Sequence, residues 1–226
     1  METIHLTNHP LEWRSPTTRI LLAFIVAGML FLFLFAPGWQ QLILSLFALA
    51  CLLGFGYLLI ITSIVRFTLT ATHFQQHLFK GGWVVKWINI SKIGLCYYDN
   101  DGWQQPMPWI GIKLKHYSPY ITSICPRIAT DVLLSQRALL YLGAKQVKQT
   151  THFEDIVLDS SPYVNSQGNE FSGLHAMLAN RMRYQRQYYD YDVFISTNDL
   201  DRPAEEFVGL ARRYLAAAKS EEDERI

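Results

Sequence analysis

A long stretch without charge constrains this chain more than any other feature. Residues 20–65 contain no Asp, Glu, Lys, Arg or His, whereas residues 66–226 have an ordinary mixture of 18 Lys/Arg and 17 Asp/Glu. A soluble domain places a quarter of its residues as charged groups throughout the chain. The stretch therefore predicts a membrane segment joined to one soluble domain, and it excludes a purely soluble protein, a disordered chain and a multi-span transporter.

The uncharged stretch divides into two candidate transmembrane helices, residues 20–36 and 42–65, around the turn-forming sequence 37–41. At about 1.5 Å per residue, 17 and 24 residues reach about 26 and 36 Å, which suits a hydrocarbon core of about 30 Å. A cleaved signal peptide is disfavoured, because the first apolar run is long and a second one follows closely. We expect an uncleaved helical hairpin.

Positive residues flank this hairpin on one side only. Arg14 and Arg19 precede it and Arg66 follows it, while the connecting turn has no charge. The positive-inside rule therefore predicts a multi-pass protein of the inner (cytoplasmic) membrane with both termini in the cytoplasm. Residues 1–19 are then a cytoplasmic N-terminal segment.

The first half of the soluble part alternates with the period of a β-strand. Gly-bearing turns separate the runs, which favours a meander that curls into a small barrel. The expected strands are 67–71, 74–79, 83–87, 88–90, 93–98 and 109–117.

The second half changes to helical spacing. The pattern predicts a helix over 127–142, a strand over 153–158, a loop over 160–173, a helix over 174–189 and a strand over 191–196. A final helix follows Asp201 as its N-cap, and residues 219–226 form a charged tail. The apolar stripe of that helix is expected to pack on the barrel, and it consists of Phe207, Leu210, Ala211, Tyr214 and Leu215.

The order of these elements, with two membrane helices before a strand meander and a strand and helix at the end, resembles the bacterial pleckstrin-homology-like (PH-like) domains that follow a two-helix anchor. The run from Phe67 to Ile93 and the strand and helix of 191–215 carry the resemblance. It implies a membrane-anchored α+β fold: a PH-like barrel over 66–218, a helical insertion at about 126–190 and a C-terminal capping helix. The whole chain also looks like the family called domain of unknown function 2982, which supplies no catalytic residues.

Charge is distributed unevenly within the soluble part. Residues 66–148 contain 10 Lys/Arg and 3 Asp/Glu, whereas residues 149–226 contain 8 and 14. The basic half either obeys the positive-inside bias alone or contacts anionic lipid headgroups, at about 1 kcal/mol per charge. The candidate lipid-facing residues are Lys80, Lys86, Lys92, Lys113 and Lys115.

Motifs of catalysis are missing from the sequence. There is no GxSxG, Walker, HExxH or GxGxxG pattern, and three cysteines without a CxxC pair predict neither a disulfide framework nor a zinc site. We therefore expect no catalytic residues, cofactor or metal. The basic and aromatic residues of 181–189 favour a helix face over a nucleic-acid site, because the net charge of the chain is near zero.

The favoured function is a non-catalytic, membrane-tethered binding or scaffolding module that presents a barrel face or groove to a protein partner. The first alternative is a sensor of anionic lipid headgroups at the cytoplasmic leaflet. A membrane-anchored enzyme that uses acids of the Asp190–Asp201 region is the remaining class.

Overall fold

Two compact units make up the chain. This computed structural model describes all residues except 1, 9–15, 36–37, 101, 148–152 and 224–226. One unit, here called the helical segment, comprises Asn8–Ile64. The other, the folded domain, comprises Met1–Thr7 together with Val65–Ile226. The short N-terminal part of the folded domain is thus separated from the rest of that domain by the whole helical segment.

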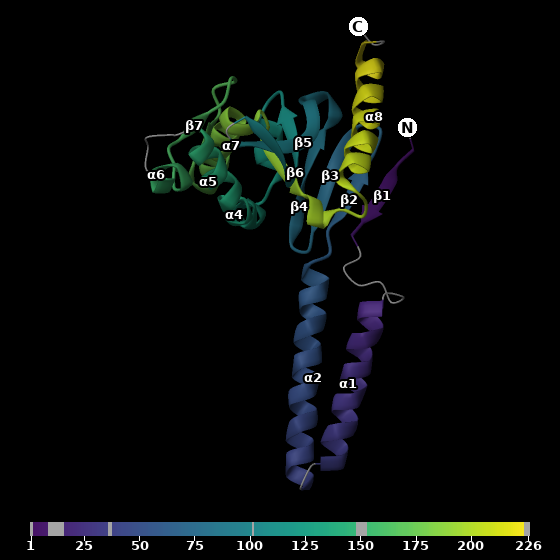
Figure 1. The fold of residues 1–226 in the computed structure, drawn as a ribbon. Helices are drawn as coiled ribbons and strands as arrows, with labels where there is room; N and C mark the ends of the chain where they lie inside the picture. Colours follow the sequence, from purple (N-terminus) through teal and green to yellow (C-terminus); the bar gives the residue numbers. More distant parts are fainter. Residues whose placement is uncertain (1, 9–15, 36–37, 101, 148–152, 224–226) are drawn as a thin grey trace. The chain divides into compact units, whose positions relative to one another are not determined.

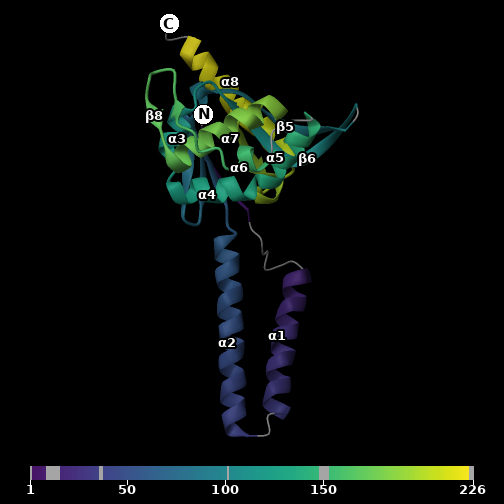
Figure 2. The same ribbon diagram turned by 90° about the vertical axis from the view of Figure 1, so that its left-hand side faces the viewer.

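The helical segment consists of α1 (Pro16–Phe35) and α2 (Trp39–Thr62), which lie side by side in both views (Figures 1 and 2). No side chain of α2 is buried, and within the described residues α2 is the helix long and apolar enough to cross a membrane. Both helices begin a few residues before the predicted limits, and α2 also ends three residues before its predicted limit. At the end of α2, the hydroxyls of Thr62 and Ser63 donate to carbonyls of the preceding turn, which helps to terminate the helix.

A strand precedes the helices, in the segment 1–19 for which the sequence suggested no structure. This strand, β1 (Ile4–Thr7), pairs antiparallel with β2 (Arg66–Leu69), the first strand after α2. Thr7 lies opposite Arg66, so the chain leaves and re-enters the folded domain at neighbouring positions. Leu6 is 5% exposed and belongs to the main hydrophobic core.

The strands form two principal sheets, and no pairing among the described strands joins them. The first has the order β1-β2-β3-β4 and the second the order β5-β6-β9. The remaining bounds are β3 (His73–Leu78), β4 (Gly81–Lys86), β5 (Ile90–Asn100), β6 (Trp103–Leu114) and β9 (Val193–Ser196), with a small ribbon of β7 (Tyr163–Val164) and β8 (Glu170–Phe171). The predicted strand 88–90 is wrong, because a 3₁₀ turn, η1 (Trp87–Asn89), occupies most of it and carries the chain from the first sheet to the second.

Helices fill the chain between β6 and β9. They are α3 (Ser118–Ser123), α4 (Pro126–Ser135), α5 (Arg137–Gln146), α6 (Phe153–Val157) and α7 (Gly173–Tyr189). The single helix predicted over 127–142 is interrupted at Gln136, a buried residue whose side chain donates to the carbonyl of Phe194 and accepts from Gln185. The strand predicted over 153–158 is helical instead. Its acidic residues 154–155 lie in the first turn, where the helix dipole favours negative charge.

The last helix, α8 (Ala204–Asp223), follows a second 3₁₀ turn, η2 (Thr197–Asp199), and extends into the predicted tail. Its five predicted stripe residues are all buried. The Phe207 ring meets those of Phe67 and Phe74 edge-on, and Tyr214 stacks on Trp87. Asp201 makes an ion pair with Arg202 and stands three residues before the helix. Figure 1 shows α8 at one side of the sheets and α4 to α7 gathered at the opposite side.

Candidate functional site: a groove beside β5 and a basic pocket

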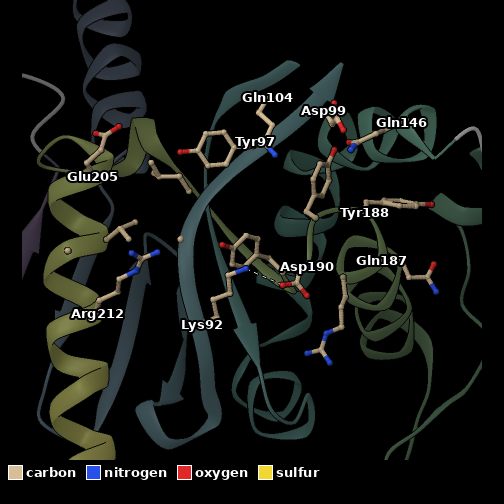
Figure 3. Close-up of a pocket in the computed structure, with 17 residues that line it drawn as sticks. Lys92, Tyr97, Asp99, Gln104, Gln146, Gln187, Tyr188, Asp190, Glu205 and Arg212 are labelled. Atoms are coloured by element: carbon tan, nitrogen blue, oxygen red, sulfur yellow. Dashed lines mark hydrogen bonds and ion pairs between the residues drawn. The ribbon is translucent and has the colours of Figure 1, made fainter. Parts of the chain in front are cut away.

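A groove of about 860 Å³, here called the β5 groove, lies between β5 and α8 and extends to the end of α7. Figure 3 shows Lys92 and Tyr97 in its middle, with Glu205 and Arg212 of α8 on one side and Gln146 and Tyr188 on the other. No pattern in the sequence indicated this groove. Its members come from segments that are far apart in the chain, and no local motif joins them.

Gly94 and Tyr191 line the groove, and a second glycine, Gly111, lies under the Tyr191 ring. Gly94 of β5 and Gly111 of β6 are cross-strand partners, and the Tyr191 side chain lies across both. A Cβ atom at Gly111 would come within 2.3 Å of the Tyr191 ring, and one at Gly94 within 2.4 Å of its hydroxyl. Only glycine permits this close approach of the strand backbones to the ring.

Asp190 stands at the edge of the groove, directly after α7. Among the described residues other than glycine, Asp190 is the one with a positive φ, 62°. Asp tolerates this conformation better than most residues. Its carboxylate accepts hydrogen bonds from Lys113 and, at 3.1 Å, from Lys92. The bond from Lys113 is the main reason that the pKa of Asp190 is lowered. Lys92 also lies 4.8 Å from the centre of the Tyr191 ring.

Asp192 is buried, and donors of the protein form hydrogen bonds with both of its carboxylate oxygens. Its carboxylate accepts from the backbone N–H of Leu114 at 2.7 Å, from the Tyr117 hydroxyl at 2.9 Å and from two nitrogens of Arg186. Burial is the largest cause of the raised pKa of Tyr117, followed by the charge of Asp192. A buried carboxylate with this many donors fixes the turn between α7 and β9 and has little capacity left for a substrate.

The acids of the Asp190–Asp201 region therefore do not converge on one point. Asp190 binds two lysines, Asp192 binds Arg186, and Asp201 binds Arg202. Asp199 is mostly buried, and desolvation raises its pKa. No arrangement of a nucleophile and a base is formed by these four side chains.

The five candidate lysines lie in three places. Lys92 and Lys113 share Asp190. Lys80 forms the two-residue turn between β3 and β4 with Phe79, because Leu78 pairs with Gly81. Lys86 stands at the other end of β4, about 17–20 Å from Lys80 at the usual rise of a strand. Lys115 lies beside Lys86, in the wall of a second pocket.

This second pocket, here called the basic pocket, has a volume of about 580 Å³. Its ionisable lining residues are all basic: His73, Lys86, Lys115 and His116. The other lining residues are Thr72, Val84, Ile88, Asn89 and Pro119. The sequence analysis named both lysines but did not predict that they share a cavity with two histidines.

Metal and thiol chemistry find little support in the described residues. No group of three or more His, Cys, Asp or Glu side chains in that part of the chain could bind a metal ion. Cys51, Cys96 and Cys125 are free thiols. Cys96 is buried, and desolvation raises its pKa to about 12.

These features define a mixed α+β domain with a groove and a basic pocket on its surface, joined to an apolar helical segment. The model of the family "protein of unknown function (DUF2982)" matches residues 67–217, so the chain belongs to this family. No curated protein and no solved structure matches the chain.

Proposed function

We propose that this protein is a membrane-tethered, non-catalytic binding module whose β5 groove receives a segment of a partner protein. In this proposal α1 and α2 form a two-span anchor in the inner membrane, and the folded domain is a PH-like domain in the cytoplasm. The pairing of β1 with β2 is the observation that carries the proposal, because it ties both ends of the helical segment to one folded body.

The pairing bears on the number of membrane crossings. Thr7 and Arg66 are neighbours across two strands, so the chain must leave and return on the same side of any membrane it enters. An even number of crossings satisfies this requirement, and one crossing does not. If α2 spans a bilayer, a second crossing is needed, and α1, with 20 residues and a single charge at Arg19, is the segment available for it. Arginine at this flank favours the cytoplasmic side.

The PH-like assignment has support from the topology. The strands β2 to β6 follow one another as antiparallel neighbours within the two sheets, and the chain ends with the strand β9 and the helix α8, which packs on the core; this is the order of elements that carries the resemblance. The helical segment then occupies the connection between the first two strands. The helices α3 to α7 occupy the connection between β6 and β9 of the second sheet, where the sequence predicts an insertion.

The residue types that line the β5 groove are more typical of a protein-binding surface than of a catalytic site. Tyr97, Tyr188 and Arg212 are of the residue types that dominate protein interfaces. The Arg212 Nε donates to the Ile93 carbonyl at 2.8 Å, which fixes the side chain in the groove. Charges of both signs are present, as in a surface that recognises a polypeptide by complementary pairs.

A photo-crosslinking experiment tests the groove. A photoreactive amino acid in place of Tyr97 should give a discrete adduct with one membrane or cytoplasmic protein, and Arg212→Ala should reduce the yield. The matched control is Trp103, which is 79% exposed and does not line the groove. The same adducts from both positions, or no adduct that depends on Arg212, would contradict the proposal.

A labelling experiment tests the anchor. In a chain whose three cysteines are replaced by Ser, a cysteine in place of Gln40 should react with a membrane-impermeant maleimide added outside intact inner membranes. A cysteine in place of Lys80 should react only after the membrane is opened. The reverse pattern would refute the orientation, and reaction of both positions from outside would refute the two-span anchor.

Contact with anionic lipid is the second candidate function, and one position favours it. Lys80 lies at the end of the first sheet where Thr7 and Arg66 connect to the helices, and Phe79 beside it is 52% exposed. An exposed aromatic ring next to a cation suits a lipid interface. A photoreactive phosphatidylglycerol in nanodiscs should label the intact chain near Lys80 and should label Lys80→Glu less. Equal labelling of the two would argue against this function.

A further inference from the structure

The basic pocket combines cationic side chains with an apolar wall. Four of its lining residues are His73, Lys86, Lys115 and His116, whereas Val84, Ile88 and Pro119 supply apolar surface. No acidic residue lines it within the described part of the chain. This differs from the pair Lys92 and Lys113, which share an ion pair with the Asp190 carboxylate.

Lys86 and His73 project into the pocket side by side. They are direct cross-strand partners, and both lie on the outward face of the sheet, because Phe74 and Val85 next to them are buried. No acidic side chain lines the pocket within the described residues, so an anion placed there would meet the Lys86 ammonium without competition from a carboxylate of the protein.

The walls of the pocket are fixed before any ligand binds. Two hydroxyls, those of Thr70 and Thr72, lie 3.0 and 2.9 Å from the Nδ1 atom of His73 and orient its ring. On the other wall, the Asn89 amide donates to the His116 carbonyl at 2.8 Å and accepts from the His116 N–H at 2.9 Å. The backbone N–H of Lys115 donates to the Asn89 carbonyl at 2.7 Å.

From this geometry we infer that the basic pocket is a binding site for a soluble organic phosphate. Lysine ammonium groups bind phosphate as point charges, and imidazole adds directed N–H donors. The apolar wall of Val84, Ile88 and Pro119 suits the organic part of such a ligand, which a free inorganic ion lacks.

The place of the pocket favours a soluble ligand over a lipid headgroup. His73 and Lys86 lie at the end of the β3–β4 pair opposite to Leu78 and Gly81. That opposite end is also where Arg66, paired with His77, connects to the helical segment. The strand length of about 17–20 Å separates the two ends and exceeds the Debye length of about 8 Å at physiological salt. This inference does not depend on the occupant of the β5 groove.

Calorimetry on the full chain in a neutral detergent tests the inference, with inorganic pyrophosphate and adenosine monophosphate as the probes. Both should bind saturably with one site per chain. Adenosine monophosphate should also bind more tightly than inorganic phosphate, which has a single phosphate group but no organic part to contact the apolar wall, and equal affinities of these two would overturn the organic ligand. Lys86→Glu and Lys115→Glu should each weaken binding at least tenfold, which is about 1.4 kcal/mol, because each variant replaces an attractive charge by a repulsive one. Lys80→Glu is the matched control, since it makes the same change of net charge elsewhere, and it should leave the affinity unchanged.

Measurements in nanodiscs distinguish a soluble phosphate from a lipid headgroup as the ligand of the basic pocket. Pyrophosphate should bind equally well in nanodiscs of phosphatidylcholine alone and in those that contain phosphatidylglycerol. Competition by phosphatidylglycerol would assign the pocket to a headgroup and overturn the soluble ligand. Equal weakening by Lys80→Glu and Lys86→Glu would show only a general charge effect, and absence of saturable binding in the native chain would refute the site. Thermal unfolding of each variant separates lost binding from lost folding.

Discussion

Replacing Leu6 by Ala tests whether the strand before the helices belongs to the folded domain. Leu6 is 5% exposed and packs in the main core. Its strand, β1, is at the edge of the sheet and pairs with β2. Truncation of a buried Leu to Ala costs about 2–5 kcal/mol. We expect the lower part of this range, about 2–3 kcal/mol, because an edge strand can relax into the cavity. For a domain of this size each kcal/mol lowers Tm by about 2–4 °C, so the expected decrease is about 4–12 °C.

The assay is the thermal unfolding of the full chain in detergent, followed by tryptophan fluorescence. Trp83 and Trp87 are buried in the folded domain and report on its unfolding. The matched control is His5→Ala in the same strand, which is exposed and should change the free energy of unfolding by less than about 0.5 kcal/mol. Identical Tm values for Leu6→Ala and the native chain would refute the pairing of β1 with β2. The argument for an even number of membrane crossings would then fail as well.

Three further predictions concern the domain itself. Gly111→Ala should displace the Tyr191 ring and destabilise the domain by about 1–3 kcal/mol, measured by denaturant unfolding, and an unchanged midpoint would contradict the close approach. Leu210→Ala should cost about 2–3 kcal/mol in the same assay if α8 packs on the core as described, and no loss would exclude this packing. At pH 8 a maleimide should modify the exposed Cys125 and leave Cys96 unmodified in the native state. The raised pKa of Cys96, about 12, leaves almost no thiolate until the pH nears 12, so rapid modification of both would show that Cys96 is accessible.

The predictions from sequence succeeded where one segment determines its own structure. The uncharged stretch 20–65 predicts helices, because backbone N–H and C=O groups in apolar surroundings must form hydrogen bonds with one another. The final helix was found because Phe207, Leu210 and Tyr214 repeat at helical spacing, and each of them is buried. The strands β2, β3 and β4 were found in the same way, from alternation with the period of a strand. Such signals depend on neighbours within a few residues.

The features that sequence reasoning missed depend on distant partners. The four residues of β1 form too short an alternation to recognise, and their partner strand follows two long helices. The position of the Tyr191 ring in the β5 groove depends on Gly94 and Gly111 together, although a glycine inside a strand was the only local signal. The basic pocket is similar, because His73 and His116 line it together although they are far apart in the chain.

The pairing of β1 with β2 also orders the events of folding. During synthesis β1 leaves the ribosome before the helical segment, and its partner strand follows only after that segment is complete. Leu6 therefore stays without its core, and β2 stays without its edge partner, until the helical segment has brought its two ends together. If α1 and α2 form the proposed two-span anchor, a chain whose first helix fails to insert would keep β1 apart from β2. The stability of the folded domain would then depend on insertion of both helices, and misinserted chains would expose an unpaired strand edge to proteolysis.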